Sequence, residues 1–388
     1  MKSNTKLSLI CACLVGFAYS ANYTNHAPIA ELLMKLFKYD KASAGLLTTG
    51  IFISHALMQI PGGMLADKFG GKNVLLIALI IVCIGNFGIA TSTTYSALLF
   101  WKIFVGFGTG TSFVSGARYI AQTIPAEKLH MSQGYYGASI LLGSGFVIFI
   151  LPKLVEVYGA WNYGFISTAA VASFALIVFA LFAPKTQVKV IHQTNLSTLI
   201  STKRLWLLGS VQMASFGLSI VIGSWITILL KEHLAIKEKL LINFIASLVL
   251  LLGIFSRPFG GKLIKKTSVL NIVMISLIMN ATGCFILSSS SITLVPAVFA
   301  IALLGIGCGL PYSSLFNKAT ELFPQRAGAA MGLVNMMGII MILIGAPLIG
   351  KIKDLTNSYS SAFVSLGIFA LLIATIFYLS EKSKKVTI

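Results

Sequence analysis

The feature that most constrains this chain is a series of long apolar runs that contain no Asp, Glu, Lys or Arg. Eleven such runs lie between Leu7 and Ser380, and short segments with charged residues separate them. A helix that crosses a bilayer needs about 20 predominantly apolar residues. The runs are continuous rather than alternating, which excludes a transmembrane β-barrel. The pattern therefore predicts a chain of membrane-spanning helices.

The longest run extends from Thr267 to Asn317 and is more than twice as long as the about 20 residues that one crossing uses. It contains a polar tetrad, residues 288–291, shortly before Pro296. We expect a break at this tetrad, which divides the run into two helices. The sequence then predicts an all-α membrane protein with twelve transmembrane helices.

Composition agrees with this class. Of the 388 residues, 57% are hydrophobic and only 10% are charged, whereas soluble domains have about 25% charged residues. The net charge of +19 comes from basic residues between the runs, as membrane topology requires, so we do not expect a nucleic-acid partner. The five cysteines lie in apolar runs, and Cys11-x-Cys13 has no second pair, so we expect neither a disulfide framework nor a metal site.

The first run, Leu7–Ala30, raises the alternative of a cleaved signal peptide. Lys2 and Lys6 form a basic start, and residues 18–20 loosely resemble a cleavage site. Apolar character continues to Ala30, however, and an even number of helices needs this span. We therefore expect it to be retained as the first helix.

The distribution of Lys and Arg predicts the orientation. With the N terminus in the cytoplasm, more basic residues fall on the inner side than on the outer side. We expect a multi-pass protein of the plasma (inner) membrane with both termini cytoplasmic. The polar stretch 185–204 predicts a cytoplasmic linker between an N-terminal six-helix bundle, 1–184, and a C-terminal one, 205–388.

The two halves also repeat. Residues 106–125, GFGTGTSFVSGARYIAQTIP, match residues 305–324, GIGCGLPYSSLFNKATELFP. A second match aligns IPGGMLADKFGGK (60–72) with PFGGKLIKK (258–266). Two matches at nearly the same offset indicate a duplication, and parallel repeats with a site between them are one known plan of transporters.

These segments carry a resemblance to a known family. Residues 63–72, GMLADKFGGK, resemble the loop 2–3 signature of the major facilitator superfamily, from which they depart in having Gly71 before Lys72. Lys102-x3-Gly106-x-Gly108-x-Gly110 is similar to its fourth-helix signature, with Lys in place of Arg. The resemblance implies a monomer of two six-helix bundles around a central path. It also implies a gating role for the signature residues Gly63, Asp67, Lys68, Gly70 and Lys72, of which Asp67 could bond the N-terminus of a neighbouring helix.

A polar stripe in the first helix predicts part of the substrate site. Tyr19, Asn22, Tyr23 and His26 are spaced i, i+3, i+4 and i+7, which places them on one helical face. Such a stripe in a membrane span should face protein or a water-filled path. The family fold favours a wall of the central cavity. Interhelical hydrogen bonds, with Tyr and His at the outer interface, are the alternative.

Further cavity candidates follow from the same reasoning: His55, Gln59, Lys102, Gln212, Ser219, Arg257 and Asn335. Lys102 lies well within the fourth helix, where it lines the path or extends to the outer surface. Arg118 and Arg257 lie near inner helix ends, where contact with lipid headgroups or loop carboxylates is the ordinary role. Arg257-Pro258-x-Gly260-Gly261 nevertheless resembles the helix-eight arginine motif of the nitrate/nitrite porter branch. That branch has a second arginine at the place that Gln59 occupies here.

The acidic residues point to an unusual coupling. None of the ten Asp and Glu residues lies in the middle of a predicted span, so the raised-pKa carboxylate of many proton symporters has no counterpart here. His26 or His55 is then the candidate proton carrier, and otherwise transport is facilitated diffusion or exchange. Basic and neutral candidates together favour an anionic or zwitterionic solute.

We therefore expect secondary active or facilitative transport of a small polar solute by alternating access, with the solute and membrane lipid as partners. The chain has no P-loop and no G-x-S-x-G motif, so we expect neither an enzyme nor a cofactor. Drug or metabolite efflux is one alternative, although the fifth helix lacks the Gly-Pro pair of the drug antiporters. A membrane sensor or scaffold is another, for which we would expect an added soluble domain.

Overall fold

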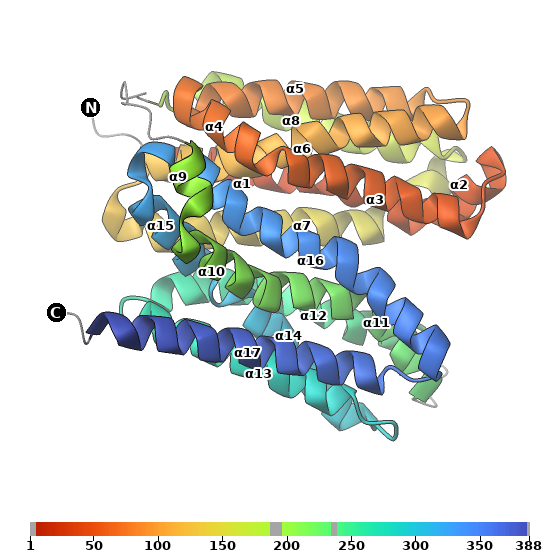
Figure 1. Ribbon diagram of the computed structural model, residues 1–388. Coiled ribbons are helices and arrows are strands. Elements are labelled where there is room, and N and C mark those ends of the chain that lie inside the picture. The colour runs from red at the N-terminus through yellow and green to blue at the C-terminus, as the bar shows by residue number, and fades with distance from the viewer. Residues whose placement is uncertain (1–4, 187–195, 234–238, 386–388) are drawn as a thin grey trace. The chain divides into compact units, whose positions relative to one another are not determined.

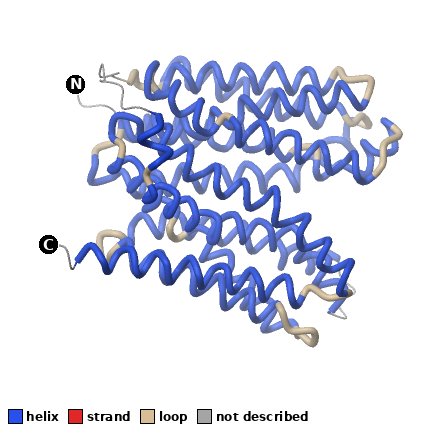
Figure 2. The backbone as a smooth tube through the Cα atoms, in the orientation of Figure 1, coloured by secondary structure: helices blue, strands red, loops and turns tan. Residues whose placement is uncertain are grey.

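In the computed structural model, which describes residues 5–186, 196–233 and 239–385, every regular element of the described chain is helical (Figures 1 and 2). The elements of the first half are α1 (Thr5–Thr24), η1 (Ala27–Ile29), α2 (Ala30–Phe37), α3 (Lys41–Leu57), α4 (Gln59–Phe69), α5 (Gly71–Ala90), α6 (Tyr95–Thr123), α7 (Ala126–Tyr158) and α8 (Asn162–Phe182). Those of the second half are α9 (Leu196–Ser201), α10 (Lys203–Gln212), a π turn (Met213–Gly217), α11 (Leu218–His233), α12 (Lys239–Leu263), α13 (Val269–Leu287), α14 (Leu294–Gly309), α15 (Tyr312–Leu322), η3 (Pro324–Arg326), α16 (Ala327–Thr356) and α17 (Ser360–Lys385).

The predicted number of spans is confirmed. Of the described helices, 11 are long and apolar enough to cross a membrane, and the bent pair α3–α4 brings the number to 12. The long run Thr267–Asn317 breaks at the expected place, because α13 ends at Leu287 and α14 begins at Leu294, on either side of the serine tetrad. The fold is thus an all-α membrane fold.

Two of the spans are interrupted next to prolines. Pro61 lies in the first turn of α4, where its missing N–H cannot bond the carbonyl of Leu57, and the axis bends by 41° between α3 and α4. Pro28 lies in η1 and lacks the donor that would bond the Thr24 carbonyl, and α1 ends at Thr24. Both breaks lie in spans that carry predicted site residues.

The chain forms two compact units. Unit 1 comprises residues 1–199 and 319–333, and unit 2 comprises residues 200–318 and 334–388. In unit 1, α5 packs against α6 and α8, and α3 packs against α6. In unit 2, α13 packs against α14 and α17, and α12 packs against α14. Each of these three helix pairs in unit 1 has its counterpart in unit 2.

The segment 319–333, which comprises most of α15, η3 and the start of α16, packs with unit 1, although the residues on either side of it belong to unit 2. The expected linker 185–204 contains the division between residues 199 and 200, but residues 187–195 lie outside the described part of the chain.

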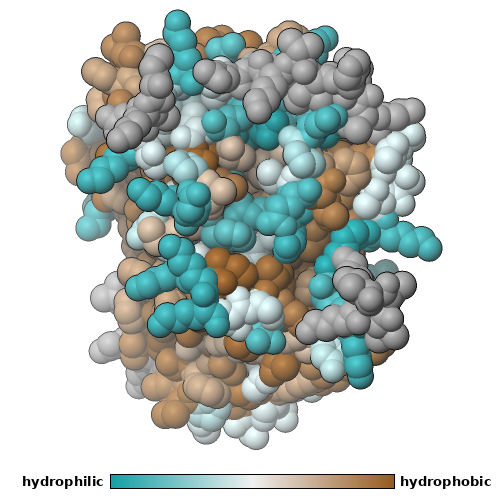
Figure 3. Space-filling view, turned by 90° about the vertical axis from the view of Figure 1, so that its left-hand side faces the viewer, coloured by the Kyte–Doolittle hydropathy of each residue, from teal (hydrophilic) through white to brown (hydrophobic). Residues whose placement is uncertain are grey.

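The surface has the character of a membrane protein. Large apolar side chains such as Phe174, Leu181 and Phe255 are exposed along the helices, where lipid would cover them. Hydrophilic residues gather in the middle of the face shown in Figure 3. Exposed apolar side chains along the helices and a hydrophilic face are both typical of membrane-spanning helices whose ends are solvated.

Glycines allow the closest helix contacts. A Cβ atom at Gly143 of α7 would overlap the carbonyl oxygen of Phe17 in α1, whereas a Cβ at Gly145 would meet no atom within 4 Å. Backbone atoms cannot move aside as a flexible side chain can. The contact between α1 and α7 therefore requires glycine at 143 but not at 145.

We predict that Gly143→Ala destabilises the protein by about 1–3 kcal/mol, because the new methyl group separates α1 from α7. Gly145→Ala is the matched control on the same helix, and it should be neutral or stabilising by up to about 1 kcal/mol, since Ala favours the helical backbone. Thermal unfolding of the two purified variants in detergent measures the difference. Equal melting temperatures would refute the close contact.

Candidate functional site

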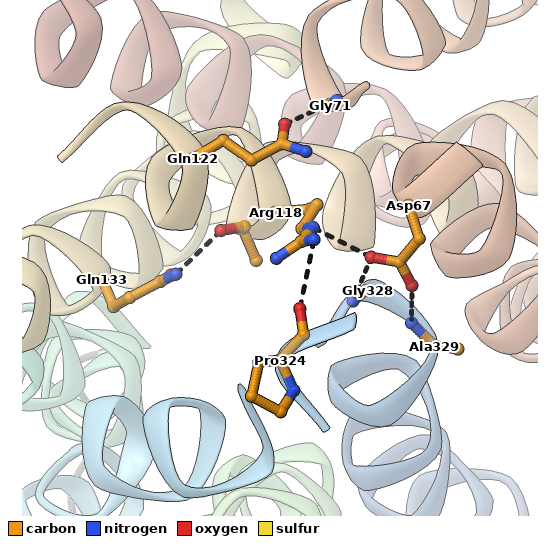
Figure 4. A network of polar contacts seen from close by, with 9 residues as sticks. Asp67, Gly71, Arg118, Gln122, Gln133, Pro324, Gly328 and Ala329 are labelled. Atoms are coloured by element: carbon orange, nitrogen blue, oxygen red, sulfur yellow. Dashed lines mark hydrogen bonds and ion pairs between the residues drawn. The ribbon is translucent and has the colours of Figure 1, made fainter. Parts of the chain in front are cut away.

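The signature residues lie at one end of unit 1, where α4 meets the start of α16 (Figure 4). Gly63 of α4 and Gly328 of α16 bring the two backbones together. A Cβ at Gly63 would overlap the Gly328 carbonyl group, and one at Gly328 would lie 2.5 Å from the Gly63 carbonyl oxygen. Any larger residue at either position would separate the two helices.

Asp67 lies beside this close contact between α4 and α16 and bonds the start of α16. Its carboxylate accepts hydrogen bonds from the backbone N–H groups of Gly328 (2.9 Å) and Ala329 (3.1 Å), and α16 begins at Ala327. The first N–H groups of a helix have no intrahelical acceptor and carry a partial positive charge. A carboxylate supplied by α4 thus caps the N-terminus of α16.

Arg118 of α6 completes the network. Its Nε lies 2.8 Å from Asp67 Oδ1, both side chains are about nine-tenths buried, and its Nη2 donates to the Pro324 carbonyl at 3.4 Å. The sequence allowed contact with lipid headgroups or with a carboxylate for Arg118, and the structure shows the carboxylate of Asp67. Neither the spacing nor the composition identified Asp67 as this partner.

The remaining signature residues hold the turn between α4 and α5. Gly70 has φ +87°, a conformation that side chains disfavour. A Cβ at Gly71 would lie 2.6 Å from the backbone nitrogen of Tyr119 in α6, which explains the second glycine of the loop. The Lys72 ammonium donates to the carbonyls of Ala180 and Ala183 at the end of α8, a favourable place for a cation. Lys68 is exposed and lies over the Phe69 ring.

A second polar cluster lies inside unit 1 and contains Lys102. The Lys102 ammonium donates to Asn25 Oδ1 and, at 3.4 Å, to the carbonyl of Asn22. Asn25 in turn donates to Asn86 Oδ1 and Thr168 Oγ1, each at 2.9 Å. Lys102 is 1% exposed. It therefore lies inside the helix bundle. Extension of its side chain to the outer surface, one of the two positions expected from the sequence, is not what the structure shows.

The other polar residues of α1 also contact neighbouring helices. Asn22 donates to the carbonyls of Ala18 (2.7 Å) and Thr168 (3.2 Å), and His26 Nε2 lies 2.8 Å from Thr48 Oγ1. The Tyr23 hydroxyl accepts from Ser144 at 2.9 Å. Tyr19 is fully buried. Asn22, Tyr23 and His26 thus make interhelical contacts in unit 1, and the lining of a cavity by this stripe stays a prediction.

The helix-two candidates pack against α6. His55 Nδ1 lies 3.1 Å from Thr109 Oγ1, and its ring contacts the edge of Tyr23 at 5.9 Å between centroids. The Gln59 amide donates to the carbonyls of His55 (3.2 Å) and Gly110 (3.3 Å). The structure therefore brings Tyr23, His55 and Gln59 together on one side of α3 and α4.

The principal cationic group inside unit 2 is Arg257 of α12, which is 2% exposed. Its guanidinium lies 4.2 Å from the ring centroid of Tyr312 and 5.3 Å from that of Phe216. Stacking on aromatic faces suits the planar guanidinium. Gln212 and Asn335 are also buried in this unit, and Ser219 donates to the carbonyls of Ser215 and Leu304.

The sequence did not predict how Phe216 is positioned. It lies in the π turn Met213–Gly217, between α10 and α11. Asn280 of α13 donates to two carbonyls of this turn, those of Ala214 (2.9 Å) and Ser215 (3.3 Å). Single π turns inside helices are frequent at functional sites. In the sequence, the only indication of this contact is Asn280 within an apolar run, and the sequence does not show which group Asn280 bonds.

In the described part of the chain, no group of three or more His, Cys, Asp or Glu residues is arranged to hold a metal ion. The chemistry available is therefore that of buried cations, amides, hydroxyls and aromatic rings. Such groups can bind and orient a solute.

Comparison with known proteins identifies the family. The model of the Major Facilitator Superfamily matches residues 12–346. The protein of Staphylococcus haemolyticus named probable nitrate transporter NarT is 26% identical over 356 residues, which cover 89% of each chain. The nitrite extrusion protein of Bacillus subtilis is 26% identical over 342 residues, which cover 86% of this chain and 83% of that protein.

Solved structures share the fold. The transporter FucP in its outward conformation superposes with a TM-score of 0.79 at 14% identity, over 96% of this chain and 98% of that one. The human organic anion transporter MFSD10 superposes with a TM-score of 0.78 at 13% identity, over 96% of this chain and 99% of that one. The chain belongs to the Major Facilitator Superfamily and is a multi-pass membrane transporter rather than an enzyme.

Proposed function

We propose that this transporter carries a small anionic or zwitterionic solute by alternating access, with Arg257 as the group that binds its negative charge. The observation that carries the proposal is the burial of the Arg257 guanidinium against the rings of Tyr312 and Phe216. An arginine inside a membrane protein is costly, and such residues mark the pathways of substrates and ions. The relatives named nitrate transporter and nitrite extrusion protein support an anion.

The solute need not be nitrate. At the place where the nitrate/nitrite branch has a second arginine, this chain has Gln59, whose amide donates to two backbone carbonyls of unit 1. A site with one fixed positive charge suits a monovalent anion, or a zwitterion whose positive end binds neutral groups. Nitrate, nitrite and small carboxylates are therefore the first solutes to test.

We also propose that the Asp67 network is a cytoplasmic gate. The carboxylate holds the start of α16 and Arg118 at once. Exchange of these three contacts with water would release the segment 319–333 from α4, and their restoration would close that end again. Gly63 supports the gate through its close contact with Gly328, and Gly70 and Lys72 support it by fixing the turn between α4 and α5, whereas the exposed Lys68 makes no contact with the network.

The topology belongs to the same proposal. Both termini lie in the cytoplasm of a plasma (inner) membrane, because this orientation puts most Lys and Arg residues on the inner side. The transporter works as a monomer in contact with lipid. Two bundles, 1–184 and 205–388, move about the linker 185–204.

We predict that Arg257→Gln lowers uptake of the anion by about 30-fold or more, since truncating one partner of a desolvated charge pair costs about 2 kcal/mol or more. Arg257→Lys should retain part of the uptake with a raised KM, because Lys keeps the charge but loses the planar stacking. Uptake of labelled nitrate, nitrite and acetate into proteoliposomes is the measurement. Lys262→Gln, an exposed cation on the same helix, is the matched control. Wild-type uptake by Arg257→Gln would contradict the role of this residue.

We predict that Asp67→Asn slows transport by about tenfold or more while solute affinity stays within about twofold. The amide loses the ion pair with Arg118 and one acceptor for α16, and such a charged contact in a partly buried site contributes about 1.5–3 kcal/mol. Uptake rates report cycling, and the thermal shift caused by the solute reports binding. Lys68→Gln, the exposed neighbour, should change neither quantity. If binding collapses while the residual complex cycles normally, Asp67 is not a gate residue.

A further inference from the structure

The Lys102 ammonium occupies an unusual position inside unit 1. It comes from the N-terminal third of α6, is 1% exposed, and faces the Asn25 side-chain oxygen, the Asn22 carbonyl and the ring of Phe165, whose centroid is 5.6 Å away. Two oxygens and a π face are all groups that attract a cation. The surroundings of Lys102 thus resemble the coordination of a positive ion.

These oxygens lie at a broken helix. Asn22 belongs to the last turn of α1, Asn25 lies in the turn that follows, and the chain continues through η1 with Pro28. Carbonyls of a last helical turn lack intrahelical partners, and the end of the helix carries a partial negative charge. In transporters with discontinuous helices, such C-terminal ends coordinate sodium ions or protons.

The directions of the hydrogen bonds also favour a cation over an anion. Both amide hydrogens of Asn25 donate away from Lys102, one to Asn86 and one to Thr168. Asn86 then donates to the Val82 carbonyl, and Thr168 donates to backbone carbonyls of its own helix. Each donor is thus used elsewhere, so Asn25 presents its oxygen to Lys102. An anion at this point would face acceptors.

Among the described residues, no carboxylate forms an ion pair with Lys102. The ion pairs found among the described residues are Asp67–Arg118 and Arg204–Glu381, and neither includes Lys102. The Asn22 side-chain oxygen Oδ1 is buried and receives no hydrogen bond from any described residue. It is a further oxygen of the same helical turn, so the cluster has more acceptor capacity than the single ammonium uses.

We infer that the end of α1 forms a monovalent-cation site, which this chain fills with its own Lys102 ammonium. The tethered cation stabilises the break in α1, so the bundle needs no dissolved cation for this purpose. Removal of the lysine opens the site to a sodium ion or a small primary ammonium ion, held by the oxygens of Asn22 and Asn25. The inference is independent of the solute proposed above.

The test is the melting temperature of purified variants in sodium chloride, methylammonium chloride and N-methyl-D-glucamine chloride at equal ionic strength. Lys102→Ala and Lys102→Ser should melt below the wild type in N-methyl-D-glucamine, and sodium or methylammonium should raise their melting temperature by about 2 °C or more. The wild type should melt at one temperature in all three salts, because its site is occupied. The serine variant supplies an additional oxygen to the site, and it allows the same measurement if the alanine variant does not fold.

Lys102→Met is the matched control. Its side chain fills the same space without a charge, so this variant should melt below the wild type and should gain nothing from either ion. The inference is overturned if the alanine and serine variants melt alike in the three salts, or if the wild type gains the same shift. A methionine variant as stable as the wild type would overturn it as well. Melting does not depend on transport, so a failure of the proposed function leaves this result interpretable.

Discussion

The absence of water in the bilayer is the constraint on which the rest of this structure depends. Every backbone N–H and C=O group within the spans must be bonded inside the chain, which leaves helices as the available element. Where a helix breaks or ends inside a span, side chains must bond the freed groups. Lys102 does so at the end of α1 and Asn280 at the π turn, and Asp67 bonds the free N–H groups at the start of α16.

The two units bond the freed backbone groups of their first spans differently, although corresponding helices pack together in both. In unit 1 the first span breaks at Pro28, and Asn25 connects α1 to α5, α6 and α8. In unit 2 the corresponding span remains helical through a π turn, and Asn280 connects that turn to α13. Both units thus tie their first span to their third span with an asparagine. The asparagine lies after the first span in unit 1 and on the third span in unit 2.

The sequence predicted the parts of the structure that follow from local pattern. Uncharged runs predicted the spans, and the serine tetrad predicted the break between α13 and α14. It did not predict partners that are far apart in the chain, because hydropathy and spacing carry no information on which buried groups meet. Arg118 was therefore left with two roles until its contact with Asp67 was seen, and the cation site around Lys102 needed the positions of Asn25, Asn86 and Thr168.

The contrast between the two buried cations bears on where a solute would bind. The Lys102 ammonium faces oxygens that are already its hydrogen-bond acceptors, so an anion there would have to displace Asn25 and the end of α1. The Arg257 guanidinium instead lies 4.2 Å and 5.3 Å from the centroids of two neutral aromatic rings, and contacts with such rings leave its formal positive charge in place. This difference favours Arg257 over Lys102 as the binding group, and it assigns the lysine to the architecture of α1.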